Sequence, residues 1–317
     1  MRYRRTLLGL FILILFTSVA GQGQTPASAT NYYQHGINNF EKGDLDGALE
    51  DYTRAIEISS SLFPAKRSPS RTPSSANAFD SAAADRITVV DPFTARAYTN
   101  RGIVLLRKGD FDGAISDFDQ AIRINSGLAE AYLGRGVARR TKGDLKGARA
   151  DFDRTLLINP RLSEAYNDRA DLRLEMGDVD GAFADLNRAL TLRPRFAVTY
   201  DQLGYARIAK HDFDNAIADF NRAIQLNPEM ASAYQGRGTA WMDKGDPERA
   251  IIDFDRALEL DPKLAVAYTN RGLAWLLQGQ DAKAQKDFEK CLLIKPDLKA
   301  ELEKRIELAK ELRSRKP

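Results

Sequence analysis

The hexapeptide AYTNRG occupies residues 97–102, and five close copies of it follow at a constant spacing. The copies read AYLGRG at 131–136, AYNDRA at 165–170, TYDQLG at 199–204, AYQGRG at 233–238 and AYTNRG at 267–272. Their tyrosines are 34 residues apart. This period is typical of a repeated helix-turn-helix unit, which is too small to bury its own apolar face and must stack on a neighbour.

Extending each copy to a full period gives six contiguous units: 95–128, 129–162, 163–196, 197–230, 231–264 and 265–298. A seventh unit precedes them at 29–62, where HGINNFEKGDLDGALEDYTRAIEIS follows the same pattern. Residues 63–94 are rich in serine, proline and basic residues, which predicts an insertion loop. Residues 299–317 place apolar side chains on one helical face, which predicts a C-terminal capping helix.

Each unit carries the residues that a pair of closely packed helices needs. Small residues at positions 8 and 20 let the two helices approach, and large residues at positions 4 and 24 fill the space beside them. A Gly-Asp pair such as Gly143-Asp144 marks the turn, because glycine accepts the left-handed backbone that ends one helix and aspartate can cap the next. A closing proline such as Pro160 ends the second helix.

This pattern resembles the tetratricopeptide repeat (TPR) family, whose motif asks for these residue types at these positions. Position 20 is alanine in all seven units: Ala48, Ala114, Ala148, Ala182, Ala216, Ala250 and Ala284. Position 24 is Tyr52, Phe118, Phe152, Leu186, Phe220, Phe254 and Phe288. The resemblance implies an all-α, right-handed superhelical solenoid, in which TPR 1 (29–62) and TPR 2–7 (95–298) precede the capping helix. It also implies a concave groove lined by positions 2, 5, 6, 9, 12 and 13 of the first helix of each repeat, here named the groove positions.

The N-terminal segment predicts export. Three arginines precede an apolar run that ends in small residues near Ala20, and this is the pattern of a signal peptide over residues 1–20, followed by a linker at 21–28. An uncleaved N-terminal anchor is the alternative. We expect a periplasmic protein if the source is bacterial, or an inner-membrane protein if the anchor is retained. Membrane contact is expected only through this segment.

The overall charge gives no reason to expect nucleic acid as a ligand. The chain has 47 basic and 44 acidic residues, and the leader alone contributes the excess of three. Without the leader the chain is neutral, so a general attraction to phosphate backbones is absent.

The sequence offers little material for catalysis or metal binding. His35 and His211 fall at repeat positions 7 and 15, which other units fill with arginine and the turn glycine. Cys291 falls at position 27, which is alanine in five other units, and we interpret it as a buried core residue. We therefore expect no enzyme activity, no cofactor, no metal site and no small-molecule substrate.

Two charged positions recur along the array. Position 23 is aspartate in every unit, and position 7 is arginine in five: Arg101, Arg135, Arg169, Arg237 and Arg271. These residues could form a ladder for a ligand. We favour ion pairs within each repeat, because both positions flank the core positions 8 and 24 and arginine pairs with a carboxylate at two points.

The groove positions hold the candidate partner-binding residues. Glu164, Asp168, Asp171 and Glu175 are spaced to share one helical face, and Asp201 and Asp243 add acid from the next two repeats. This stripe is either an ordinary solvated face or an acidic segment that selects a basic peptide. Apolar candidates follow at further groove positions: Tyr205, Ile208, Met242, Leu273, Leu276 and Leu277. A partner or the capping helix could cover this apolar wall.

The resemblance also argues against one kind of partner. Family members that hold a C-terminal carboxylate use lysine at position 5 and asparagine at positions 6 and 9, and here only Asn100 and Asn270 match at position 6. The sequence thus predicts a non-catalytic scaffold that binds a protein or peptide partner. The alternatives are an anchored accessory subunit of an envelope assembly or secretion complex, and an enzyme with an unrecognised site.

Overall fold

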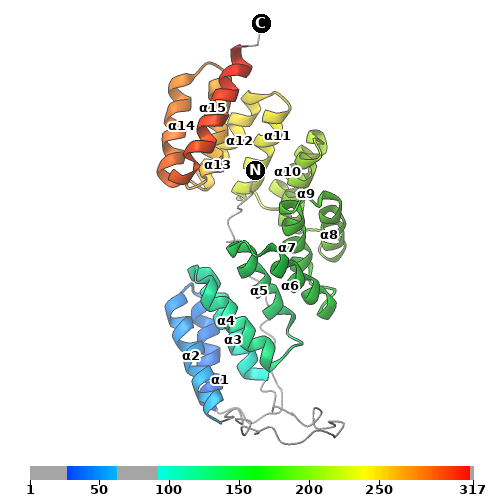
Figure 1. The fold of residues 1–317 in the computed structure, drawn as a ribbon, viewed down its shortest axis with the longest axis vertical. Helices are drawn as coiled ribbons and strands as arrows, with labels where there is room; N and C mark the ends of the chain where they lie inside the picture. The colour runs from blue at the N-terminus through cyan, green and yellow to red at the C-terminus, as the bar shows by residue number, and fades with distance from the viewer. Residues whose placement is uncertain (1–26, 63–91, 315–317) are drawn as a thin grey trace, which may run out of the picture. The chain divides into compact units, whose positions relative to one another are not determined.

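The computed structural model describes residues 27–62 and 92–314, drawn as ribbons in Figure 1. Over these residues the chain forms fifteen α-helices and a short 3-10 helix, with no strand, so the all-α prediction is confirmed for them. The expected leader at 1–20 and most of the expected insertion at 63–94 lie outside the described residues.

Each repeat supplies a first helix, A, and a second helix, B. The A helices are α1 (Ala27–Glu41), α3 (Pro92–Lys108), α5 (Ala129–Lys142), α7 (Ser163–Glu175), α9 (Ala197–Ala209), α11 (Ala231–Asp243) and α13 (Ala265–Leu277). The B helices are α2 (Leu45–Leu62), α4 (Phe111–Ile124), α6 (Leu145–Ile158), α8 (Val179–Leu192), α10 (Phe213–Leu226), α12 (Pro247–Leu260) and α14 (Asp281–Ile294). The 3-10 helix η2 (Pro296–Leu298) and α15 (Lys299–Ser314) complete the described chain.

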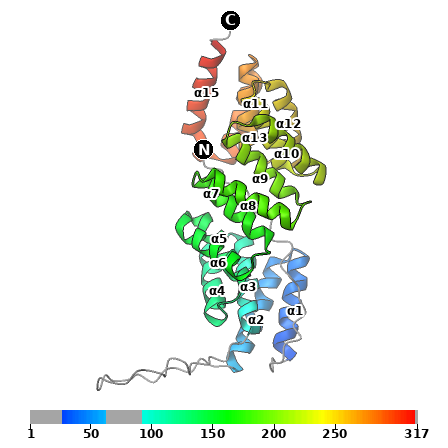
Figure 2. The ribbon, with the colours of Figure 1, turned by 90° about the vertical axis from the view of Figure 1, so that its right-hand side faces the viewer.

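The chain divides within α7, after Leu172, into an N-terminal and a C-terminal compact unit. In the N-terminal unit the pairs α1–α2, α3–α4 and α5–α6 stack through contacts of α2 with α3 and of α4 with α5. In the C-terminal unit the pairs α9–α10, α11–α12 and α13–α14 stack through α10–α11 and α12–α13 (Figure 2). Each unit is therefore an all-α repeat solenoid in which α3, α5, α9, α11 and α13 each pack on the preceding B helix.

The turn between helices A and B is set by glycine and aspartate. Six turn glycines have φ between +77° and +88°, the left-handed region that only glycine enters freely. The next residue caps helix B: Asp110 and Asp144, for example, accept a hydrogen bond at 2.9 Å from the backbone N–H three residues later. His211 takes the glycine position in the fifth repeat with φ 59°, so it serves the turn at some cost in backbone strain.

The core of six of the seven repeats depends on close contact between a glycine of helix A and an aromatic ring of helix B. A Cβ added at Gly102 would lie 2.9 Å from Cε1 of Phe118, and one at Gly136 would lie 2.6 Å from Cε1 of Phe152. Both rings are fully buried. The ring of Phe118 is also covered by Gly134 of the next repeat, where a Cβ would lie 2.3 Å from Cζ. Glycine thus sets how closely the helices of one repeat, and of two neighbouring repeats, approach.

The insertion does not interrupt the packing of the first two repeats. Lys108 of the second repeat forms an ion pair with Asp46 of the first, as Lys142 does with Asp112 at the next junction. The hydroxyls of Ser59 and Thr94 lie 2.6 Å apart at the same interface. The helix register is therefore continuous across residues that add nearly a full repeat to the chain.

None of the helices within 27–62 and 92–314 combines the length and apolar character needed to cross a membrane.

We predict that Gly102→Ala destabilises the second repeat by about 1–3 kcal/mol, since Phe118 has no free space into which to move. Phe118→Leu should rescue part of this loss, because the shorter side chain leaves room for the new methyl group. The fourth repeat holds this combination, Ala170 and Leu186, at the same two positions. Chemical denaturation of the single and double variants should give a coupling energy of about 1 kcal/mol or more.

Phe152→Leu is the matched control, because it removes the same atoms one repeat further on and should not rescue Gly102→Ala. Strict additivity of Gly102→Ala and Phe118→Leu would contradict the proposed contact.

Candidate functional site

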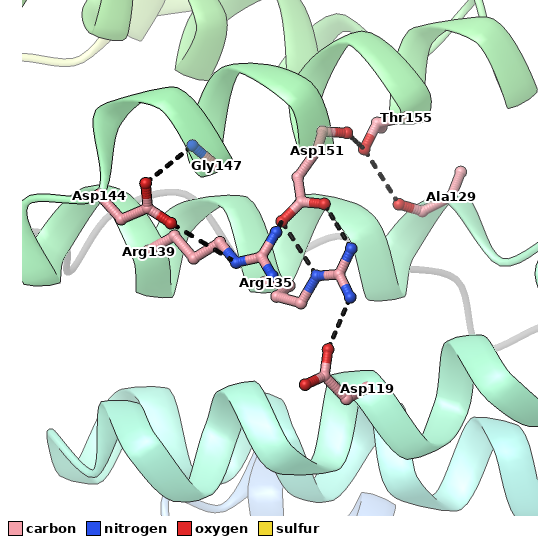
Figure 3. A network of polar contacts seen from close by, with 8 residues as sticks. All are labelled: Asp119, Ala129, Arg135, Arg139, Asp144, Gly147, Asp151 and Thr155. Atoms are coloured by element: carbon pink, nitrogen blue, oxygen red, sulfur yellow. Dashed lines mark hydrogen bonds and ion pairs between the residues drawn. The ribbon is translucent and has the colours of Figure 1, made fainter.

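The recurring arginine and aspartate form a structural ladder, which Figure 3 shows in the third repeat. Nε and Nη2 of Arg135 donate to the two carboxylate oxygens of Asp151 at 3.0 and 2.6 Å. Nη1 of Arg135 donates to Asp119 of the preceding repeat at 2.6 Å. One guanidinium therefore ties helix A to helix B of its own repeat and to helix B of its neighbour.

The predicted ion pair sixteen residues apart is confirmed in four repeats, by Arg101, Arg135, Arg237 and Arg271. For Arg169 it stays a prediction: the structure gives Arg169 an ion pair with Asp153, and gives Asp185 one with Arg173. Position 7 is Leu203 in the fifth repeat, where Arg207 takes over and donates to Asp219 at 2.5 Å. These arginines are bound within the repeat array, so the ligand-ladder reading is not supported.

The residues considered for catalysis were Cys291, His35 and His211. Cys291 is fully buried, with its Sγ 3.0 Å from Oγ1 of Thr269. His35 lies exposed on α1, and His211 lies in the turn before α10. Among residues 27–62 and 92–314, no group of three or more His, Cys, Asp or Glu side chains is arranged to hold a metal ion.

The N-terminal unit brings three of the candidate acids together on α7. Asp168 is buried with 8% of its surface exposed, and Glu164 and Asp171 are half-buried. Asp171 forms an ion pair of 3.6 Å with Arg140 of α5. Burial raises the pKa of Asp168 to about 7. The positive charge of Arg140 opposes this rise, and the negative charges of Asp171 and Glu164 add to it.

Within the stripe, Asp168 is therefore buried rather than solvated, and Asp171 has a basic neighbour in Arg140. Glu175, the fourth acid of the stripe, is the exposed last residue of α7 and belongs to the C-terminal unit.

The C-terminal unit places Asp201, Tyr205 and Ile208 on α9, and all three are at least 93% buried. Asp201 accepts a hydrogen bond from Oγ of Ser232 at 3.3 Å. The Tyr205 hydroxyl donates to the backbone carbonyl of Ser232 at 3.1 Å and accepts from Nε2 of Gln235 at 3.3 Å. The groove positions of α9 and α11 are thus joined by a polar network, and their side chains have defined places.

The remaining candidates lie near the end of the array. Met242 and Leu277 are half-buried against Leu273 and Leu276, in the apolar cluster that also includes Leu302 of α15. Asp243 is exposed at the end of α11, yet neighbouring protein displaces enough water to raise its pKa, against the opposing effect of His211 and Arg305. The apolar side chains predicted at these groove positions are therefore covered by the capping helix α15.

Two neighbours of the candidate residues were not anticipated from the sequence. Arg140 pairs with Asp171, and Arg305 donates from Nη2 to Oδ1 of Asn270 at 2.9 Å. Arg140 stands at groove position 12 of the third repeat, so the repeat register contained a signal that could have found it. Arg305 stands outside the repeats, and no periodic pattern relates it to Asn270.

We predict that Asp168→Asn stabilises the protein above about pH 7 and has little effect near pH 4. The carboxyl ionises near 3.8 under ordinary conditions and near 7 in the fold. The folded state therefore holds an extra proton between these values, and this residue makes the wild type less stable as the pH rises through that window. Thermal unfolding followed by circular dichroism should show a gain in Tm of a few degrees for the variant at high pH, since about 1 kcal/mol corresponds to roughly 2–4 °C.

Glu50→Gln, which removes one charge from the exposed surface of α2, controls for the change in net charge. A gain in Tm that is the same at every pH would show that Asp168 does not titrate in this window.

Models of the tetratricopeptide repeat family match the chain at residues 29–61, 95–128, 163–196, 202–265 and 265–298. No curated protein sequence matches it.

Solved structures with the same fold include a tetratricopeptide repeat protein from Parabacteroides merdae, at 19% identity and a TM-score of 0.64, covering 89% of this chain and 98% of that one. A chain from the APC/C hetero-tetramer Cut9–Hcn1 gives 17% identity and a TM-score of 0.63, with 87% of this chain and 55% of that one covered. The structure of Pseudomonas aeruginosa pilF gives 18% identity and a TM-score of 0.54, with 64% of this chain and 92% of that one covered. These identities show the fold alone.

Family matches over more than half of the residues, together with the same paired helices in both units, establish that the chain belongs to the tetratricopeptide repeat family, whose members are generally non-catalytic scaffolds for protein or peptide partners.

Proposed function

We propose that this protein is a non-catalytic scaffold that binds a partner protein or peptide at its groove positions, outside the cytoplasm. The observation that carries the proposal is the placement of charged and polar side chains at those positions. Asp168 is buried there, although removing a carboxylate from water raises the free energy of the fold unless an opposite charge or a hydrogen bond compensates it. Residues of this kind are unfavourable for folding alone, which supports a role in binding.

The acids of α7 favour a basic partner. A lysine or arginine placed beside Asp168 would stabilise its ionised form and lower its pKa, so the bound state would recover part of the free energy that burial removes. Asp171 and Glu164 lie close enough to act on the same charge. Because Asp168 is about half protonated near pH 7 before binding, a basic partner should bind more tightly as the pH rises through 7.

Export rests on the sequence of the first twenty residues, which lie outside the described structure. A basic start and an apolar run that ends in small residues support a cleaved signal peptide. The second candidate function, an anchored accessory subunit of an envelope complex, requires that the same segment stays attached.

We expect the double variant Asp168→Asn, Asp171→Asn to lose most of its partner capture. Wild type and variant would be immobilised in parallel, exposed to envelope extract at low and high salt, and the retained proteins quantified by mass spectrometry. A partner recognised through these acids should be retained roughly tenfold less by the variant at low salt, equivalent to about 1.4 kcal/mol. Its salt dependence should also flatten, because screening acts on the charges that were removed.

Glu50→Gln, Glu57→Gln is the matched control, since it also removes two negative charges but from helix B of the first repeat, away from the groove positions. Equal loss in both variants would assign the effect to net charge and would contradict specific recognition by α7.

For the exported form we expect an N-terminus close to Gly21. N-terminal sequencing of the protein recovered from the expressing cells measures this directly. A chain that still begins at Met1 and fractionates with membranes would favour the anchored accessory subunit instead.

A further inference from the structure

The C-terminal helix α15 lies on α13, the A helix of the last repeat. In the repeats before it, α11 and α13 each pack first on the B helix of their own repeat and next on the B helix of the preceding repeat, so that α11 lies on α10 and α13 lies on α12. The helix that follows the last repeat would continue the array if it packed on α14 in the same way. Its main contact is with α13 instead, so α15 is placed where the groove positions are rather than where an eighth repeat would begin.

The apolar contacts of α15 fall on groove positions. Leu302 and Ala309 are 1% and 6% exposed, and they share a cluster with Leu273 and Leu276, positions 9 and 12 of the seventh repeat. Ile306, one helical turn from Leu302, packs against the same cluster. These three residues of α15 are spaced i, i+4 and i+7, which places them on one face of the helix.

Two arginines on the same side of α15 make directed contacts. Arg305 donates to the side-chain oxygen of Asn270, at groove position 6, and the Asn270 amide donates in turn to Oγ1 of Thr239 at 3.2 Å. Arg313 donates to the backbone carbonyl of Leu276 at 3.1 Å and forms an ion pair with Asp281. Asp243 of α11 acts electrostatically on Arg305. The surface under α15 therefore accepts apolar side chains in its centre and arginine at two places.

We infer that α15 is an internal occupant of a partner-binding surface built from the groove positions of the last two repeats. The partner that fits this surface is an amphipathic helix with apolar residues at i, i+4 and i+7 and arginine at i+3 and i+11, the pattern of Leu302 to Arg313. This inference rests on the proposed binding function and names the class of partner. The partner competes with α15 for the same contacts.

Competition is physically reasonable because α15 is held by few buried side chains. Only Leu302 and Ala309 are buried on it, and Leu308 and Leu312 on the same helix are 57% and 49% exposed. Segments with so little buried surface open at a small fraction of the free energy of global unfolding. Because α15 is tethered through η2, it acts at a high effective concentration and lowers the apparent affinity of any partner.

The test uses the full chain and a fluorescein-labelled synthetic peptide of residues 299–314, with binding measured by fluorescence anisotropy. Leu302→Asp with Arg305→Glu should release α15 and raise peptide affinity at least tenfold above that of the wild type. The matched control is Lys304→Glu with Leu308→Asp, which makes the same change in charge on exposed positions of α15 and should leave affinity unchanged. A peptide that carries Leu302→Asp and Arg305→Glu should not bind the released chain.

Hydrogen exchange keeps the result interpretable if the release variant is unstable. In the wild type, saturating peptide should speed exchange at 299–314 and leave α3–α5 unchanged. The inference is overturned if peptide affinity does not rise in a variant whose α11–α14 amides remain protected, or if excess peptide leaves α15 exchange unchanged. A wild-type dimer formed by exchange of α15 between copies, detected by light scattering, would also overturn it, because the occupant would then be a second copy of this chain. Failure of the peptide alongside successful capture of a partner at α7 would reject this inference and leave the proposed function intact.

Discussion

The close approach of helix A to helix B over one buried aromatic ring is the constraint on which the rest of the structure depends. Glycine at position 8 meets the ring at position 24 in six of the seven repeats, and any added Cβ would collide with it. The contact fixes the distance and register of each helix pair. It therefore also fixes where the residues next to positions 8 and 24 lie. Because Gly134 and Gly236 cover the rings of Phe118 and Phe220 from the next repeat, the same contact joins repeats into a stack.

This packing brings an aspartate at position 23 close to the core, and its charge must be paired. Arginine at position 7 meets that need in four repeats, Arg207 at position 11 does so in the fifth, and Asn39 donates to Asp51 at 2.9 Å in the first. Three different side chains thus satisfy one structural demand. The acids at groove positions are different, because repeat packing does not require them. The proposed function assigns these acids at groove positions to partner binding.

The groove positions of the two units have distinct chemistry. On α7 and α5 a buried carboxyl, a second acid and Arg140 form a charged cluster that a cation can alter. On α13 an apolar surface is already covered by α15, whose arginines reach Asn270 and Asp281. The two proposals accordingly assign a basic partner to the N-terminal unit and an amphipathic helix to the C-terminal unit.

The sequence by itself determined the repeat, its register and the helix ends, because these depend on local residues at a fixed period of 34. It also determined that Arg135 pairs with Asp151 and that Cys291 is buried, since both follow from position within the repeat. Only the tertiary structure decided that Asp168 is buried close to the charge of Arg140 and that α15 packs on α13. These features depend on contacts between side chains of different helices that do not follow the 34-residue spacing. The sequence pattern also does not show how much water such contacts exclude from a carboxyl group.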